Sequence, residues 1–186
     1  MPLRRTAAVL VLLGMGCGPR EDGGGFAAPE LAMDAGLVHP TVEFSEVLVG
    51  RVLDGDTVTL VAPSGSLAPD QQPLNEARVR FIGVDTPELG HGDPSDCFAE
   101  EARTFTRDRI EGRVVRIEFD YSGGLRDPFG RILAYVVYDG EVLNEALVRG
   151  GYARVFRQFV YRERTRYLAL EGEARSRRLG LWGACP

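Results

Sequence analysis

Residues 80–88 read Arg-Phe-Ile-Gly-Val-Asp-Thr-Pro-Glu, and this stretch decides how the rest of the chain is interpreted. Its first half favours a buried strand, because Phe81, Ile82 and Val84 are apolar and strand-forming. Pro87 then ends the strand, since proline lacks an N–H and disfavours a helical conformation in the residue before it. The stretch therefore carries a cation within a rigid strand and presents two carboxylates and a threonine at its end.

Those polar residues are suited to binding a metal ion and a phosphate. The carboxylates of Asp85 and Glu88, together with the guanidinium of Arg80, fit a hard metal ion beside a phosphate. A strand that simply leaves the core into solvent would use the same residue types. This segment alone leaves both interpretations open.

Composition narrows the class of protein. The chain has 186 residues and is 44% hydrophobic, enough for one domain with a real core and additional segments. The net charge of −5 argues against a protein that coats nucleic acid non-specifically. All 22 basic residues are arginine, the better bidentate partner for phosphate. Nine of them follow position 148, beside three Glu, and this excess fits either a nucleic-acid contact or a solvated helix face.

The first residues have the features of a targeting segment. Arg4 and Arg5 precede an apolar run at 7–13 that is too short to remain as a membrane span. Cys17 follows Gly16 as in a bacterial lipoprotein cleavage site, although Gly14 stands where leucine is usual. We expect a signal peptide of lipoprotein type over residues 1–17, with lipid on Cys17 attaching an exported protein to a membrane. An ordinary signal peptide and a secreted protein are the alternative.

The next segment separates this signal from the folded domain. Residues 18–44 are rich in Gly, Ala, Pro and acids without a sustained period, which indicates a flexible linker. The folded domain is expected over residues 45–186. In an oxidising compartment Cys97 and Cys185 form a natural disulfide pair that would tie a helix start to the C-terminal tail. Two unrelated thiols are the alternative.

The remaining pattern predicts an α+β fold. Five strands are expected at 47–53, 57–61, 77–84, 113–119 and 132–138, and helices from Ser95 or Asp96 to about 110, at 142–149 and at 160–179. Asp54-Gly55 supplies a hairpin turn between the first two strands. Residues 62–76 form an inserted surface loop. Five strands in this order, with three packed helices, fit a small closed β-barrel of the oligonucleotide-binding (OB) fold.

At this point the chain resembles the staphylococcal-nuclease (thermonuclease) family. The matching runs are Asp54-Gly55-Asp56-Thr57, residues 80–88, Asp127-Pro128-Phe129-Gly130-Arg131 and Asn144-Glu145-Ala146-Leu147-Val148. They agree with the family in type, order and spacing from about residue 45 to 182. The resemblance implies a monomeric, calcium-dependent endonuclease that hydrolyses DNA and RNA and leaves 3′-phosphate ends.

The resemblance also implies roles for individual residues. Asp56 and Asp85 correspond to the side-chain ligands of Ca²⁺, and Thr86 to a ligand through its backbone carbonyl. Glu88 corresponds to the proposed general base. Arg80 and Arg131 correspond to the two arginines on the scissile phosphate, where forked guanidinium groups meet the charge that grows in the transition state.

This sequence departs from the family among the residues that contact the nucleotide. The family's Lys-Tyr pair is Pro128-Phe129 here, and two tyrosines near the base are replaced by Arg157 and Phe159. Phe129 and Phe159 can still stack on a base, and Arg157 can stack or pair with a phosphate. We expect all three to bind substrate.

Two other functions use the same fold. One is a catalytically inactive nucleic-acid-binding OB module at the cell envelope, and the other is a structural envelope lipoprotein. Binding alone needs the basic and aromatic residues but places no demand on Asp56, Asp85 and Glu88 together. Their joint presence favours the nuclease.

Overall fold

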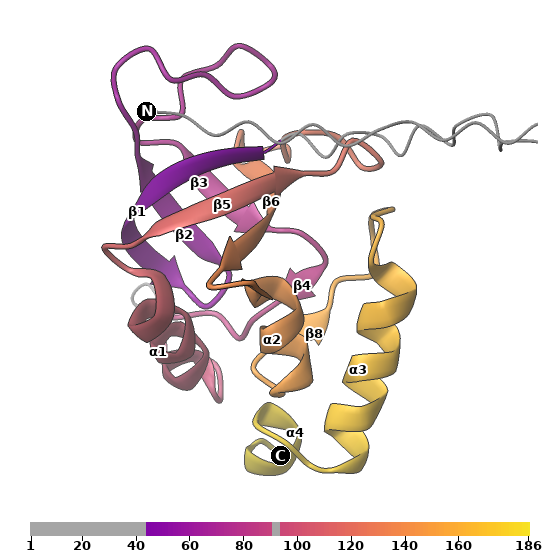
Figure 1. Ribbon diagram of the computed structural model, residues 1–186. Coiled ribbons are helices and arrows are strands. Elements are labelled where there is room, and N and C mark those ends of the chain that lie inside the picture. Colours follow the sequence, from indigo (N-terminus) through magenta and orange to yellow (C-terminus); the bar gives the residue numbers. More distant parts are fainter. Residues whose placement is uncertain (1–43, 91–93) are drawn as a thin grey trace, which may run out of the picture. The chain divides into compact units, whose positions relative to one another are not determined.

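The computed structural model describes residues 44–90 and 94–186 (Figure 1). The predicted signal peptide, its Cys17 and the predicted linker up to residue 43 lie outside the described residues. Phe44, placed at the end of that linker by the sequence, instead begins the first strand. The segments before it remain predictions.

Five strands close into a barrel. They are β1 (Phe44–Asp54), β2 (Thr57–Val61), β3 (Arg78–Phe81), β5 (Val114–Phe119) and β6 (Ile132–Tyr138). Strand β1 pairs with β2 and β5, β2 pairs with β3, and β5 pairs with β6, all antiparallel. The parallel pairing of β3 with β6 closes the circle, and the two-residue β7 (Glu141–Val142) extends β6. The predicted OB-type barrel is therefore confirmed.

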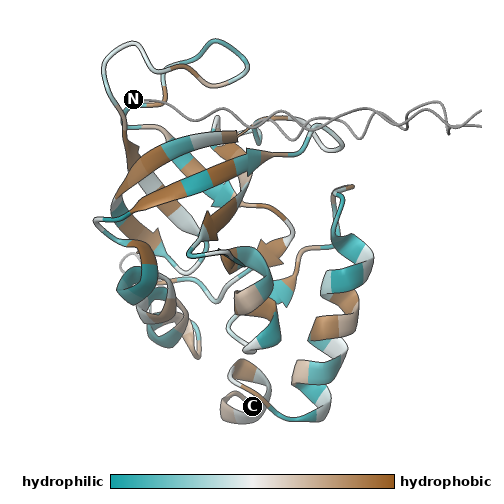
Figure 2. Cartoon of the chain, viewed as in Figure 1, coloured by the Kyte–Doolittle hydropathy of each residue, from teal (hydrophilic) through white to brown (hydrophobic). Residues whose placement is uncertain are grey.

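Alternation of apolar and polar residues builds the barrel core. Along β5, Val115, Ile117 and Phe119 are buried, while Val114 and Arg116 between them are exposed. Figure 2 shows the same alternation of brown and teal along the strands. Because side chains on a strand point to opposite faces in turn, this pattern alone directs one face of β5 into the barrel.

Helices pack against the outside of the barrel. They are α1 (Ala99–Ile110), α2 (Leu143–Arg149), α3 (Arg164–Ser176) and the single-turn α4 (Leu181–Ala184). Helix α1 packs on β1, and α2 lies between β6 and α3 (Figure 1). The three predicted helices are present, and α4 is an addition. None of the helices in the described residues is long and apolar enough to span a membrane.

The predicted third strand is broken in two. Strand β3 ends at Phe81, and the two-residue β4 (Val84–Asp85) pairs with β8 (Arg154–Val155) instead of continuing along the barrel. The break lies at Gly83, which has a φ of +77°, and a Cβ atom there would come within 2.5 Å of the ring of Tyr161. This glycine therefore redirects the chain and sends Asp85 out of the barrel wall.

The predicted helix starts also differ. Neither Ser95 nor Asp96 caps α1; its N-cap is Phe98, in a left-handed conformation with a φ of +75° and no side-chain cap. Helix α3 begins at Arg164 and not at 160. The preceding residues are held elsewhere, because the N–H of Arg162 donates to Asp120 at 2.8 Å.

Candidate active site

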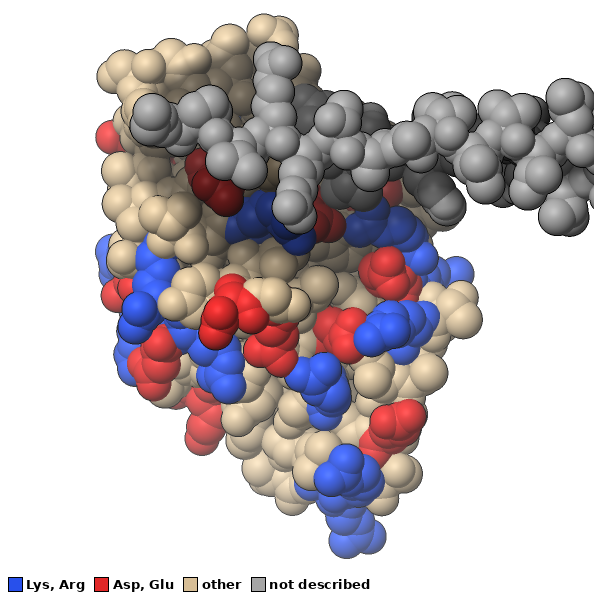
Figure 3. Space-filling view, viewed as in Figure 1, with Lys and Arg blue, Asp and Glu red and all other residues tan. Residues whose placement is uncertain are grey.

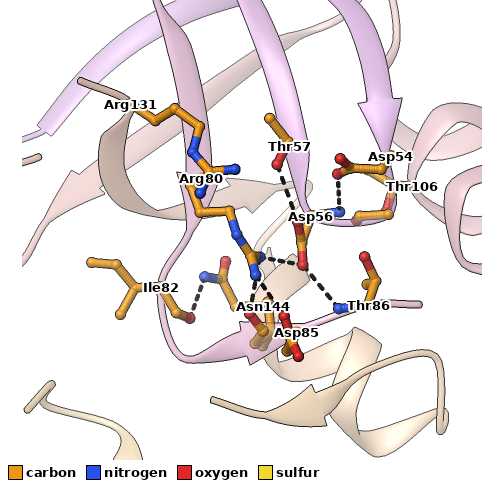
Figure 4. Close-up of polar contacts among 12 residues, drawn as sticks. Asp54, Asp56, Thr57, Arg80, Ile82, Asp85, Thr86, Thr106, Arg131 and Asn144 are labelled. Atoms are coloured by element: carbon orange, nitrogen blue, oxygen red, sulfur yellow. Dashed lines mark hydrogen bonds and ion pairs between the residues drawn. The ribbon is translucent and has the colours of Figure 1, made fainter. Parts of the chain in front are cut away.

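The centre of the site is Arg80, on β3. Its guanidinium forms ion pairs with Asp56 and with Asp85, the latter at 2.9 Å, and donates to the carbonyl of Val84 at 2.9 Å (Figure 4). The pairing of β3 with both β2 and β6 fixes the backbone beneath this side chain. Asp56, which is distant in sequence, thus meets Val84 and Asp85, which follow closely on Arg80, around the Arg80 guanidinium.

Asp56 lies directly after the turn between β1 and β2. Its side chain is 1% exposed and accepts hydrogen bonds from the N–H of Thr86 at 2.9 Å and the hydroxyl of Thr57 at 3.1 Å. Its own N–H donates to Asp54 at 3.2 Å. The carboxylate is therefore held rigidly against the strand end that carries Asp85 and Thr86.

Helix α1 fixes the turn that carries Asp56. The hydroxyl of Thr106 donates to the carbonyl of Gly55 at 2.6 Å, and both groups are buried. A Cβ atom on Gly55 would lie 2.6 Å from the methyl carbon of Thr86, so only glycine permits this close approach.

The second arginine, Arg131, lies just before β6. Its Nε donates to Asp127 at 2.6 Å, and the same carboxylate accepts the N–H groups of Arg131 and Phe129, each at 2.9 Å. The two terminal nitrogens of Arg131 form no hydrogen bond within the described residues. They are available to an anion.

The inserted loop at 62–76 supports this turn. Arg126 forms an ion pair with Asp70 of the insertion and donates to the carbonyl of Gly130 at 2.9 Å. The contacts run from the insertion through Arg126 to the residue immediately before Arg131. The insertion therefore supports the turn that carries Arg131.

These elements surround one pocket of about 290 Å³. Its lining includes six of the residues predicted from the sequence: Arg80, Asp85, Glu88, Phe129, Arg131 and Phe159. Phe129 is 84% exposed and Phe159 43% exposed at the rim. These six predicted residues bring two cations, two acids and two aromatic rings to one opening.

Three predicted residues do not line that pocket. Asp56 and Thr86 are buried behind Arg80, which contacts Asp56 directly. Arg157 forms an ion pair with the buried Glu171 and donates to the carbonyl of Val155 at 3.3 Å. The structure therefore gives Arg157 a contact within the fold and places it outside the pocket where substrate contact was expected.

Burial disfavours the charged form of the three acids of the site. Burial raises the pKa of Asp56 to about 6, although the guanidinium of Arg80 opposes the shift. Burial also raises the pKa of Asp85, and burial followed by the charge of Asp56 raises that of Glu88. Because three carboxyl groups are shifted in the same direction, the site would be stabilised by additional positive charge.

The oxygen atoms present fit a hard cation. The Oγ1 atom of Thr86 is buried without a hydrogen-bond partner in the described part of the chain, beside the contact between its N–H and Asp56. No group of three or more His, Cys, Asp or Glu side chains within residues 44–90 and 94–186 is arranged to hold a metal. Asp56 and Asp85 would need the oxygens of Thr86 and water to complete a coordination shell, as Ca²⁺ accepts.

Most C-terminal arginines are engaged in ion pairs. Arg166 pairs with Glu145 at 2.7 Å, Arg162 with Glu163 at 3.2 Å, and Arg175 with Glu171 at 3.6 Å. Figure 3 shows acidic and basic side chains interspersed over the face drawn. The arginine excess therefore favours the solvated-face interpretation for this region.

Some residues of the pocket were not identified from the sequence. Asp127, Asp120 and Tyr161 line it, and Asp127 orients Arg131. The spacing of Asp127 four residues before Arg131, within a run already singled out, is the signal that could have identified it. No comparable local signal marks Asp120 or Tyr161, which reach the pocket through long-range packing.

Fold and site together define a small OB-type barrel with a charged pocket at the exit of β3. A sequence model described as "Staphylococcal nuclease homologue" matches residues 78–184. The chain therefore belongs to the staphylococcal nuclease family.

Individual relatives agree with this assignment. The SPbeta prophage-derived endonuclease YokF of Bacillus subtilis is 34% identical over 147 residues, covering 75% of this chain and 45% of the relative. Endonuclease YncB of the same organism is 33% identical, covering 73% of this chain and 61% of the relative. Thermonuclease of Staphylococcus intermedius is 35% identical, covering 73% and 74%. The chain thus spans only about half of the two Bacillus relatives.

Proposed function

We propose that this protein is a calcium-dependent endonuclease that hydrolyses phosphodiester bonds in DNA and RNA. The observation that supports this most strongly is the convergence of Arg80, Asp85, Glu88 and Arg131 on one pocket. Relatives that align with most of this chain are named endonuclease and thermonuclease. Binding of nucleic acid alone places no demand on Asp56, Asp85 and Glu88 together.

Asp56, Asp85 and Thr86 are the residues that would hold the metal ion. When bound, a Ca²⁺ ion polarises a phosphoryl oxygen and lowers the pKa of a coordinated water. The raised pKa values of the acids and the unpartnered hydroxyl of Thr86 support a cation at this position.

The chain's own residues would complete the reaction. Glu88 accepts a proton from the attacking water, whose oxygen bonds to phosphorus while the bond to the 5′ oxygen breaks and that oxygen takes up a proton from solvent. Arg131 donates its terminal N–H groups, which form no hydrogen bond within the described residues, to the phosphate oxygens, and Arg80 donates from β3. Phe129 and Phe159 offer exposed rings on which bases stack.

Export is a further part of this proposal. Its support is the sequence of residues 1–17, in which Cys17 would carry the lipid that anchors the protein to a membrane. We also propose that the chain acts as a monomer. Mass spectrometry of the mature N-terminus tests the anchor. An unmodified Cys17 in a full-length or secreted chain would contradict it.

A cleavage assay tests the enzymatic proposal. Plasmid DNA and a defined RNA are incubated with the protein in Ca²⁺, in excess chelator, and in chelator followed by added Ca²⁺. We expect cleavage of both that stops in chelator and returns with the metal. Arg131→Ala should lose activity, whereas Arg166→Ala, which removes an exposed arginine paired with Glu145, should not. Binding without cleavage would instead support the inactive OB module.

A further inference from the structure

The segment that follows Glu88 is closed by hydrogen bonds between its two ends. The N–H of Glu88 donates to the Asp96 carboxylate at 3.1 Å, and the N–H of Asp96 donates to the Glu88 carbonyl at 2.9 Å. The N–H of Gly90 also donates to the Ser95 hydroxyl at 3.1 Å. The side-chain bonds of this set are exposed to solvent, so each contributes little alone.

The next residue carries a covalent anchor. A disulfide joins Cys97 to Cys185, 88 residues away, between the start of α1 and the end of α4. Residues 94–97 are exposed, and packing resumes at Phe98, whose ring contacts that of Tyr152, and at Ala99, which is 1% exposed. The bridge therefore adds a covalent constraint on Asp96 to the packing at the start of α1.

The other end of the bridge is firmly placed. Leu181, at the start of α4, is 2% exposed, and its N–H donates to the Gly151 carbonyl at 2.9 Å. The N–H of Cys185 donates in turn to the Leu181 carbonyl at 3.1 Å. The disulfide thus fastens an exposed segment to α4, whose first residue, Leu181, is buried in the domain.

We propose that the Cys97–Cys185 disulfide and Asp96 are a positioning device for Glu88, so that hydrolysis depends on an intact bridge. This inference rests on the proposed nuclease function. A general base must stay within hydrogen-bond distance of the water it activates, and a displacement of about 1 Å can cost on the order of a hundredfold in rate. Without the bridge, Asp96 keeps its hydrogen bonds to Glu88 and its link to the start of α1 but loses the covalent tie to α4, so the support of Glu88 is less firmly fixed.

Reduction of the Cys97–Cys185 disulfide should weaken the positioning of Glu88. Dithiothreitol supplies two electrons and two protons, the S–S bond becomes two thiols, and the reagent closes to its own cyclic disulfide. A chain kept reduced before export would therefore be a poor nuclease until the bridge forms.

The test uses the full chain with Cys97 and Cys185 both replaced by alanine. Turnover of a short oligonucleotide in Ca²⁺ is measured at a temperature where circular dichroism shows every variant folded. We expect kcat to fall about 10- to 100-fold, with KM within about twofold of wild type. Asp96→Ala should behave alike, and Asp96→Asn, which keeps an acceptor oxygen, should recover most of the rate.

Two controls separate positioning from general stabilisation. Val115→Ala removes buried volume from β5, away from the pocket, and should lower stability without changing kcat. In a Glu88→Gln background, removal of the bridge should cause no further loss, because both changes act on one group. A bridge-free variant within twofold of wild-type kcat, or losses that multiply with Glu88→Gln, would overturn the inference. An oxidised wild type that cuts nothing in Ca²⁺ would instead refute the proposed function on which the inference rests.

Discussion

Asn144→Ala should destabilise the domain out of proportion to the few atoms removed. Asn144 lies in α2 and is 0% exposed. Its amide nitrogen donates to the carbonyls of Ile82 at 2.9 Å and Ala134 at 3.2 Å, and its oxygen accepts the N–H of Val136 at 2.9 Å. One side chain thereby joins α2 to β6 and to the segment that links β3 with β4.

The size of this destabilisation follows from the buried backbone groups that lose their hydrogen-bond partner. The Ala134 carbonyl keeps a bond from the N–H of Ile82 at 3.0 Å, but the Ile82 carbonyl and the Val136 N–H lose their partner. Each buried unsatisfied group costs about 1–3 kcal/mol, so we expect a loss of about 2–5 kcal/mol. For a domain of this size that lowers the melting temperature by on the order of 10 °C.

Urea denaturation followed by circular dichroism measures this loss. Arg149→Ala is the matched control, because Arg149 lies in the same helix but forms only exposed ion pairs, which contribute about 1 kcal/mol or less. Since Ile82 lies between Arg80 and Asp85, kcat should also fall for Asn144→Ala while the protein is still folded. A loss no greater than that of the control would refute this reasoning.

Three other predictions concern the site and its supports. Arg131→Ala should keep its unfolding transition but lose about a hundredfold in kcat, since it removes a pre-placed donor; unchanged turnover would contradict the assignment. Reducing the Cys97–Cys185 bridge should lower the free energy of unfolding by about 4–5 kcal/mol by the loop-entropy model for an 88-residue separation, measured in urea with and without dithiothreitol. Burial alone would raise the pKa of Asp120, but two backbone N–H groups and the Tyr135 hydroxyl hold it below its usual value. The ionised Asp120 therefore stabilises the fold above about pH 4, and this contribution is lost as the pH falls through the lowered pKa. Asp120→Asn should flatten the stability profile below that pH.

The barrel could be predicted because apolar and polar residues alternate along its strands. The alternation in 113–119 and the Asp54-Gly55 turn determine β5 and the β1–β2 hairpin from local sequence alone. Gly83 was harder to interpret, because apolar residues continue on both sides of it and the ring that packs against it belongs to Tyr161, which is distant in sequence.

The identity of most site residues could be predicted from the sequence, but the partners of their side chains could be predicted only in part. Four charged residues that line the pocket, Arg80, Asp85, Glu88 and Arg131, come from motifs whose order and spacing match the family. Local sequence could not show that Glu171, on α3, would take Arg157 as its partner. Nor could it show that Asp70, in the loop at 62–76, would support the Arg131 turn through Arg126. Such pairings depend on tertiary packing.

The dependence of cleavage rate on free Ca²⁺ concentration tests the central claim most directly. Our account predicts that wild-type cleavage of DNA and RNA rises with Ca²⁺ to a plateau, falls to background in chelator, and shifts to much higher Ca²⁺ in Asp85→Asn, which loses a ligand charge. Cleavage that persists undiminished in excess chelator, or an Asp85→Asn variant with an unchanged calcium dependence, would contradict it.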